Sequence, residues 1–272
     1  NVLPGTYGAI YQLTKFTDTK LKSLLEDRKI KKIVYGDHSK QEQNFYKKLN
    51  DIIENTSKDG IVTSPFLYLT RQQVTTYFTR FELFKLTQES SIKGSFVECG
   101  TNHGNSMMMY YHFLSIFEPY ALNKKIIVFD TFAGFPSIHK KDSTGKVGDL
   151  KTRGQDYLQN VINTHDSNRA VSHIPKVELI KGDAVKTIPK YVKENPQLII
   201  SFLYLDFDLY EPTKAALKYL LPLVPKGGLV GFDELASKRW PGETSAAKEF
   251  LSLNKTKIKT FQYDPNVSYF IV

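Results

Sequence analysis

Two pairs of acidic residues end apolar runs in the second half of this sequence. Asp206 and Asp208 follow "LIISFLYL", and Asp233 and Glu234 follow "GGLVGF". The runs have the continuous hydrophobic character of strands buried on both faces of a sheet. Carboxylate oxygens without histidine or cysteine are ligands that suit Mg²⁺. The two pairs therefore indicate the rim of a metal or acid–base site, and a surface role is the alternative.

A glycine-containing turn, "VECGTNHGNS" at 97–106, follows an earlier apolar run and opens a helix. Gly100 and Gly104 permit a tight turn, and the helix start near Asn105 offers free N–H groups to a carboxylate or phosphate. The carboxylate of Glu98 would repel a pyrophosphate, which disfavours a dehydrogenase, but would attract an ammonium group. The methionine part of S-adenosylmethionine carries both an ammonium and a carboxylate. An ordinary strand–helix turn is the alternative interpretation.

Two more acidic residues end predicted strands. Asp130, in "VFDTFAGFP", can accept both ribose hydroxyls of an adenosine or can cap a helix. Asp183, in "KGDA", can contact an adenine edge or cap the helix that follows. Because ligands of open α/β sheets bind at the carboxyl ends of the strands, acids at five successive strand ends predict a functional cleft there.

The elements that must position these acids change in type near residue 90. Helical periodicity predicts helices over 17–30, 39–57 and 70–90, with a loop over 59–69; the last helix carries Val74, Phe78, Phe81 and Phe84 on one face. Beyond residue 90, strands are predicted over 94–99, 124–130, 176–183, 198–206 and 227–234, with helices over 105–118, 184–194 and 212–223. This alternation predicts a parallel sheet covered by helices. "KIKTFQY" and "VSYFIV" flank "DPN", which predicts a closing antiparallel hairpin and a mostly parallel seven-stranded sheet.

A long polar segment, 137–170, interrupts this pattern and carries several lysines, arginines and glycines. A loop of this length is usually functional or disordered, so we interpret it as a mobile lid over the substrate. Its cations can meet a nucleotide diphosphate, and His139 at its start is an alternative general base. Farther along, "KRWPGET" supplies Trp240, which can line a sugar pocket or pack in the core, together with Arg239 and Glu243.

Composition limits the class of protein. The net charge is +9, from 37 Lys and Arg against 28 Asp and Glu, but the basic residues are scattered and no nucleic-acid motif appears. No apolar run approaches the roughly 20 residues that cross a bilayer. One cysteine, Cys99, and no recognisable leader predict a reducing, cytoplasmic setting. We therefore expect neither a nucleic-acid partner nor a membrane partner.

The motifs occur in an order that resembles the macrocin O-methyltransferase family. They are "VECGTNHGNS", "VFDTFAGFP", "ELIKGDAVKTIP", "LYLDFDLYEPT" and "KGGLVGFDE", and they span about 90–250. The resemblance implies a class I methyltransferase (Rossmann-like) fold over 91–272, S-adenosylmethionine and Mg²⁺ as cofactors, and a sugar-containing small-molecule acceptor. Residues 1–90 would then be a helical cap or oligomerisation segment, and the chain a homo-oligomer with an interface at 70–90.

The same resemblance assigns roles to individual residues. Asp206, Asp233 and Glu234 match the metal-ligand acids, although Glu234 stands where the family often has Asp, which puts its direct ligation in doubt. Asp208 matches the position of the general base; capping of the following helix is the alternative. We expect the cofactor to contact Glu98, Gly100, Thr101, Gly104, Ser106, Asp130, Thr131, Phe132, Asp183, Ala184 and Asp206.

Other functions remain open on the sequence alone. A methyltransferase of a catechol or another hydroxyl compound would need similar acids, and an aminopropyltransferase also uses a sulfonium nucleotide. A nucleic-acid methyltransferase would explain the positive charge and would require strongly salt-dependent binding. A non-catalytic binding protein would keep the fold and lose affinity for cofactor and metal.

Overall fold

The computed structural model describes residues 40–272. This part of the chain divides into two compact units between Thr76 and Tyr77. The helix predicted over 17–30 lies outside the described residues. The first unit contains α3 (Lys40–Glu54), α4 (Lys58–Thr63) and the 3-10 helix η2 (Pro65–Leu67). The loop expected over 59–69 is therefore partly helical, because Ser57 caps α4 by accepting a hydrogen bond from the Gly60 N–H at 3.0 Å.

The second unit is built on a seven-stranded sheet in the order β3-β2-β1-β4-β5-β7-β6. The strands from β1 to β5 are parallel, and β7 runs antiparallel to both β5 and β6. The predicted mostly parallel sheet with a closing hairpin is thus confirmed. The strands are β1 (Ser95–Cys99), β2 (Ile126–Asp130), β3 (Val177–Lys181), β4 (Ile200–Leu205), β5 (Leu229–Phe232), β6 (Lys259–Phe261) and β7 (Asp264–Ile271).

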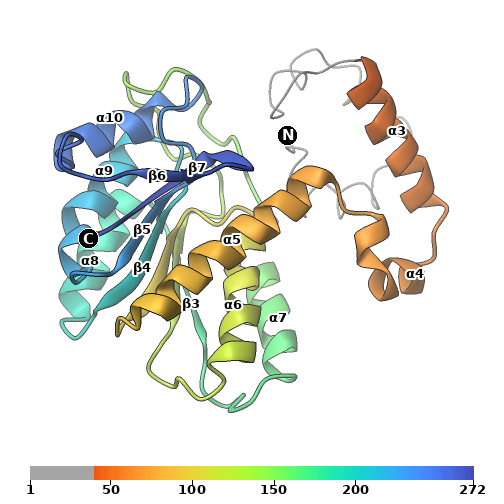
Figure 1. The fold of residues 1–272 in the computed structure, drawn as a ribbon, viewed down its shortest axis with the longest axis horizontal. Coiled ribbons are helices and arrows are strands. Elements are labelled where there is room, and N and C mark those ends of the chain that lie inside the picture. The colour runs from red at the N-terminus through yellow and green to blue at the C-terminus, as the bar shows by residue number, and fades with distance from the viewer. Residues whose placement is uncertain (1–39) are drawn as a thin grey trace. The chain divides into compact units, whose positions relative to one another are not determined.

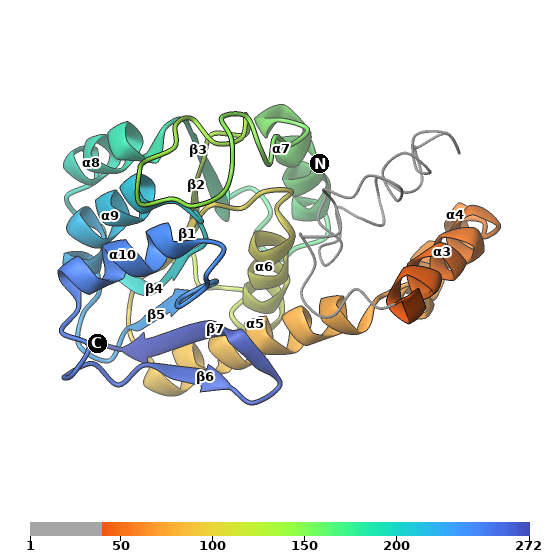
Figure 2. The same ribbon diagram turned by 90° about the horizontal axis from the view of Figure 1, so that it is seen from above.

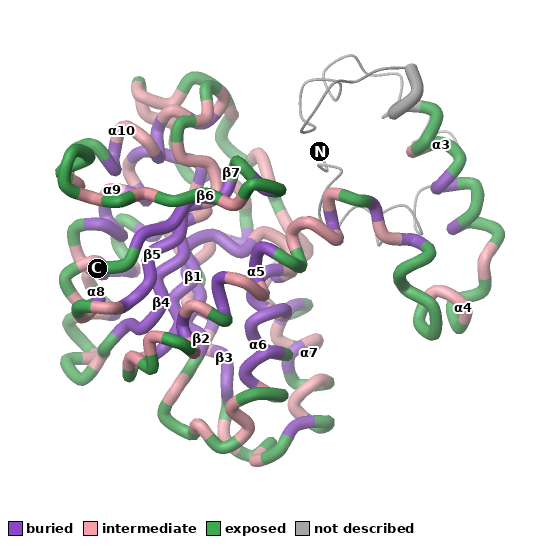
Figure 3. The backbone as a smooth tube through the Cα atoms, in the orientation of Figure 1, coloured by how far each residue is buried: buried purple, intermediate pink, exposed green. Residues whose placement is uncertain are grey.

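Helices cover both faces of this sheet (Figures 1 and 2). One face carries α6 (Asn105–Phe117), α7 (Gln155–Asp166) and the second-unit part of α5 (Arg71–Ser90). The other face carries α8 (Ala184–Glu194), α9 (Tyr210–Tyr219) and α10 (Pro241–Phe250). The 3-10 helix η3 (Leu221–Leu223) follows α9. Alternate strand residues enter two separate cores: Phe96 packs with the first set of helices and Val97 with the second. Figure 3 shows the central strands buried along their length.

Helix α5 buries a face that its aromatic pattern indicates only in part. Phe84 of the predicted stripe is buried and Phe81 packs against the core, but Phe78 is 54% exposed. In the second unit, the buried positions also include the polar side chains Thr79 and Arg80. The helix is therefore turned so that Arg80 faces the interior of this unit.

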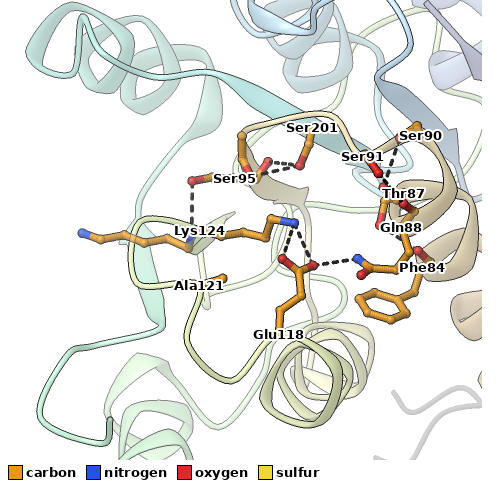
Figure 4. Close-up of polar contacts among 12 residues, drawn as sticks. Phe84, Thr87, Gln88, Ser90, Ser91, Ser95, Glu118, Ala121, Lys124 and Ser201 are labelled. Carbon is orange, nitrogen blue, oxygen red and sulfur yellow. Dashed lines mark hydrogen bonds and ion pairs between the residues drawn. The ribbon is translucent and has the colours of Figure 1, made fainter. Parts of the chain in front are cut away.

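The edge of the sheet at the amino ends of the strands is tied by a polar network (Figure 4). Lys124 Nζ lies 2.7 Å from Glu118 and Gln88 Nε2 donates to the same carboxylate at 2.6 Å, which joins α5, the end of α6 and the turn before β2. Ser201 Oγ donates to the main-chain oxygen of Gly94 at 3.0 Å. This edge is occupied by structural contacts, whereas the acids of interest lie at the opposite edge.

Two details of the predicted elements are wrong. The hairpin turn lies at 262–263 and not at "DPN", because Asp264 is already part of β7 and its buried carboxylate accepts a hydrogen bond from Thr79 Oγ1 at 2.7 Å. The polar segment 137–170 is not one loop, since α7 forms within it and buries Leu158 and Ile162. In the part of the chain that the structure describes, no helix is long and apolar enough to cross a membrane.

Candidate active site

Main-chain hydrogen bonds bring the acidic strand ends together. The ladder continues one residue past each strand: the Asp206 N–H donates to the Cys99 oxygen at 2.8 Å, and the Asp233 N–H donates to the Leu205 oxygen at 2.9 Å. The Gly100 N–H similarly donates to the Phe129 oxygen at 2.8 Å. The ends of β2, β1, β4 and β5 therefore lie in one row, which places the cofactor loop beside the acidic pairs.

The glycine loop turns as predicted, but its glycines are required chiefly by contacts within the protein. Gly100 and Gly104 have φ of +88° and +87°, a region that favours glycine. A Cβ on Gly100 would meet the main chain of Asp206, and one on Gly104 would lie 2.5 Å from Leu158 Cδ1. Among residues 40–272, no side chain caps the start of helix α6, so its first N–H groups are open to a ligand.

Asp130 organises this loop from the neighbouring strand. Its Oδ2 accepts hydrogen bonds from the main-chain N–H groups of Thr101 and Asn102, at 2.8 and 3.1 Å. Its Oδ1 accepts from the Phe132 N–H at 2.6 Å. Burial raises the pKa of the Asp130 carboxyl, and these three backbone hydrogen bonds oppose the rise. Asp130 therefore shapes the loop by holding its backbone, and contact with a ribose stays a prediction.

The other predicted cofactor residues lie along the same edge. Asp183 caps α8 by accepting from the Val185 N–H at 3.1 Å, which is one of its two predicted roles; an adenine contact stays a prediction. Thr131 Oγ1 donates to the Gly134 oxygen at 2.6 Å. Thr101, Phe132 and Ala184 are buried.

Glu98 is a buried carboxylate whose hydrogen-bonding capacity is largely unused. It is 2% exposed, and within the described chain neither of its oxygens has a partner at full hydrogen-bond geometry. Burial raises the pKa of the Glu98 carboxyl to about 8, although the charge of Arg80 and the approach of the Thr101 side chain oppose the rise. A buried charge without a partner is costly, so this carboxylate fits a cationic ligand group such as an ammonium.

The acids after β4 and β5 form a crowded cluster. Burial raises the pKa of Asp206 well above its usual range, and the charges of Asp233 and Asp208 raise it further. Burial likewise raises the pKa of Asp208, with added effects of Glu234, Asp233 and Glu243. Glu243, from α10, is completely buried, and its Oε1 accepts from the Glu234 N–H at 3.2 Å. Several carboxyl groups thus compete for protons in a small volume.

This donor set fits a divalent cation in its chemistry. It consists of carboxylate oxygens, which suit Mg²⁺, and a bound cation would relieve the repulsion that raises the pKa values. Within residues 40–272, no three His, Cys, Asp or Glu side chains already surround a common point. Asp233 Oδ1 instead accepts hydrogen bonds from Arg80 Nη2 at 2.8 Å and from the Tyr204 hydroxyl at 2.5 Å.

Arg80 is a site residue that the sequence pattern does not reveal. Besides Asp233, it contacts Ser106, whose Oγ accepts from Arg80 Nε at 2.8 Å. Its guanidinium lies over the ring of Tyr204, 4.3 Å from the centroid. The only available signal was a positive charge within an aromatic helix, which by itself indicates a solvent-exposed residue.

Asp208 belongs to the cluster and lies in a strained turn. Strand β4 ends at Leu205, so strand geometry does not extend to Asp208. Asp208 has φ of +62° and is buried. It does not cap α9, because the Tyr210 N–H at the start of that helix donates to Asp142 Oδ1 at 2.9 Å. The capping alternative for Asp208 is therefore wrong.

The segment that contains His139 is fastened beside this turn. The His139 ring stacks on Tyr210 with centroids 4.7 Å apart, and its Nε2 lies 3.8 Å from Glu211. Trp240 is 5% exposed and packs edge-on against Phe135, so its packing alternative is the one observed. Because Thr144 Oγ1 also donates to the Arg239 oxygen at 2.5 Å, the first part of the expected lid is held against the domain.

Comparisons with known proteins agree with this arrangement. The model of the macrocin O-methyltransferase family (TylF) matches residues 81–271, well over half of the chain. A crystal structure of the calicheamicin methyltransferase CalS11 is 30% identical with a TM-score of 0.81, over 87% of this chain and 95% of that chain. The structure of the O-methyltransferase NovP, 18% identical with a TM-score of 0.59 over 74% of this chain and 81% of that one, shares the fold. No protein with a curated description matches.

A second CalS11 structure, the apo form, is described as a TDP-rhamnose 3'-O-methyltransferase. It is 28% identical to this chain with a TM-score of 0.74, over 87% of this chain and 96% of that chain. The fold, the order of the motifs along the chain and the extent of these matches agree. This chain therefore belongs to the macrocin O-methyltransferase family and is an S-adenosylmethionine-dependent O-methyltransferase.

Proposed function

We propose that this enzyme methylates a hydroxyl group of a sugar-containing small molecule, with the help of a divalent cation. The observation that carries the proposal is the row of strand ends, where the unpartnered carboxylate of Glu98 lies beside the acidic cluster of Asp206, Asp208, Asp233, Glu234 and Glu243. CalS11 supports the choice of a sugar acceptor, since its description names a TDP-linked sugar.

In this proposal the cofactor half of the site binds the amino-acid end of S-adenosylmethionine. Glu98 receives the ammonium group, and the uncapped start of α6 with Ser106 receives the carboxylate. Asp130 holds the loop in the shape that this binding requires. The sulfonium methyl group would then face the acids that follow β4 and β5.

The acidic half prepares the acceptor. Asp206, Asp233 and Glu234 would hold Mg²⁺, which supplies Lewis acidity that lowers the pKa of the acceptor hydroxyl. Asp208 would take the hydroxyl proton as general base, with His139 as the alternative. The oxygen attacks the methyl carbon, the carbon–sulfur bond breaks, and S-adenosylhomocysteine leaves. We further propose that residues 137–154, the part of the expected lid before α7, cover the acceptor. Residues 77–90 belong to the second unit, so the proposed helical cap or oligomerisation segment, expected over 1–90, is limited to residues before Tyr77.

Calorimetric titration tests the cofactor and metal parts. S-adenosylmethionine and Mg²⁺ are titrated into wild type, Asp206→Asn and, as a matched control, Glu118→Gln, which alters an acid in the structural network at the opposite edge of the sheet. We expect micromolar cofactor binding in all three proteins and loss of Mg²⁺ binding only in Asp206→Asn. A wild type that binds no S-adenosylmethionine with or without Mg²⁺ would contradict the proposal.

An acceptor panel tests the substrate class. Wild type is incubated with S-adenosylmethionine, Mg²⁺ and, separately, TDP-linked deoxysugars, free sugars and catechol, and products are identified by mass spectrometry. Methylation of a sugar-containing acceptor is the expected result. Methylation of catechol with no reaction of any sugar compound would replace the proposed acceptor with an aromatic hydroxyl.

A further inference from the structure

Arg80 joins two parts of the site that come from distant segments of the chain. Its Nε donates to Ser106 Oγ at the start of α6, and its Nη2 donates to Asp233 Oδ1 after β5, both at 2.8 Å. The residue is 3% exposed, and its guanidinium lies over the Tyr204 ring. Because a guanidinium is planar and rigid, fixing one of these hydrogen bonds also orients the other.

Several buried polar groups around Arg80 lack hydrogen-bond partners in the described chain. Arg80 Nη1 and the Tyr110 hydroxyl are buried without a hydrogen-bond partner in the described chain, as are both oxygens of Glu98. Asp233 is also held by the Tyr204 hydroxyl, so its position depends on two donors. Unpaired buried groups cost free energy, and their presence beside a ligand site indicates an arrangement that binding completes.

We propose that Arg80 is a positioning residue that couples the two halves of the site, so that cofactor binding near Ser106 and Mg²⁺ binding at Asp233 strengthen each other. A ligand that fixes Ser106 fixes the guanidinium, and the guanidinium then holds Asp233 in one orientation. The second ligand meets a site that is already ordered, which is the thermodynamic condition for positive coupling. The inference rests on the proposed function, because it needs both ligands.

Calorimetry measures the coupling directly, without turnover. S-adenosylhomocysteine is titrated into wild type and Arg80→Lys in the absence and presence of saturating Mg²⁺. Lysine keeps the charge but has no planar guanidinium group, so it cannot donate to Ser106 and Asp233 from two fixed directions. In wild type we expect Mg²⁺ to lower the Kd of S-adenosylhomocysteine about tenfold, within the usual range of coupling between sites. In Arg80→Lys we expect a change below about twofold.

Thr79→Val is the matched control. Thr79 is the preceding residue on α5, and its buried Oγ1 donates to Asp264 Oδ2 at 2.7 Å, away from Ser106 and Asp233. We expect this variant to have a lower Tm and the same coupling as wild type. If Arg80→Lys does not fold, Arg80→Gln replaces it, because the shorter amide side chain cannot hold Ser106 and Asp233 together.

The outcomes separate this inference from the function on which it rests. Coupling that is lost in Arg80→Lys or Arg80→Gln and kept in Thr79→Val supports the inference. Equal coupling in Arg80→Lys and wild type, no coupling in wild type, or the same loss in Thr79→Val would each overturn it. A wild type that binds neither S-adenosylmethionine nor S-adenosylhomocysteine under any condition would overturn the proposed function as well.

Discussion

A Cβ on Gly100 would lie 2.1 Å from the main-chain oxygen of Asp206, so the cofactor loop and the acidic end of β4 meet backbone to backbone. The Asp206 N–H also donates to the Cys99 oxygen at 2.8 Å. No side chain separates the loop from the acid at this point. The relative position of the two halves of the site is thus fixed by the sheet itself.

Gly100→Ala is expected to destabilise the protein strongly. The new methyl group would have to displace the Asp206 backbone, and the residue would have to keep a φ of +88°. We expect a loss of about 3 kcal/mol or more in the free energy of unfolding, together with loss of cofactor binding. Urea denaturation and calorimetry measure the two effects.

Gly148→Ala serves as the control for this substitution. Gly148 has a similar φ of +85°, but nothing lies within 4 Å of a Cβ there. Only the conformational cost remains, about 1–2 kcal/mol. Equal losses in the two variants would show that the contact with Asp206 is unimportant.

Glu98→Gln is expected to change how stability depends on pH. The Glu98 pKa is about 8 in the folded protein, raised by burial, against about 4.3 for an unperturbed glutamate. Between these values the folded state holds a proton that the unfolded state has lost, so stability falls as pH rises. In Glu98→Gln, the free energy of unfolding should therefore decrease less between about pH 5 and about pH 8 than in wild type. Urea denaturation across this pH range measures the difference. Glu89 is exposed, so Glu89→Gln should behave as wild type.

Cofactor binding should release protons for the same reason. Near neutral pH the Glu98 carboxyl is largely protonated in the ligand-free protein, but it must be ionised to pair with an ammonium group. Titrations of S-adenosylhomocysteine in buffers with different ionisation enthalpies measure the number of protons released. We expect net release near neutral pH in wild type and a clearly smaller value in Glu98→Gln. Unchanged proton release in the variant would remove Glu98 from the ammonium site.

The sequence predicts the parts of the site that depend on strand periodicity. Continuous apolar runs end at Asp206 and Asp233, and parallel strands place such ends at one edge, so their proximity follows from the pattern. Arg80 was not predictable in this way. Its burial depends on which face of α5 meets the sheet, and the aromatic stripe of that helix marked only part of that face.

Local contacts between distant segments were also not predictable. Asp142 caps α9 from 68 positions away, a role that the sequence analysis offered only as the alternative for Asp208. Helix α7 was missed because its segment is mostly polar, and only Leu158 and Ile162 are buried. Both features depend on tertiary packing, which a local pattern does not encode.

Asp208→Asn is expected to lower kcat and leave cofactor binding intact. Loss of a general base typically costs about 10²–10⁴-fold in rate. The rate is measured with the acceptor that wild type methylates, and the Kd of S-adenosylhomocysteine should stay within about twofold of wild type. His139→Gln tests the alternative base. A large loss in His139→Gln with near-normal turnover in Asp208→Asn would reverse the assignment.

Asp142→Ala is expected to loosen the segment that contains His139. Asp142 Oδ1 accepts from the Tyr210 N–H and Oδ2 from the His139 N–H, both at 2.9 Å, so one carboxylate ties this segment to the start of α9. Removing a helix cap costs about 1 kcal/mol, which corresponds to roughly fivefold faster amide exchange around 138–145. If the segment covers the acceptor, the KM of the acceptor should rise more than kcat falls. Lys140→Ala, an exposed neighbour, is the control, and an unchanged KM in Asp142→Ala would separate this segment from acceptor binding.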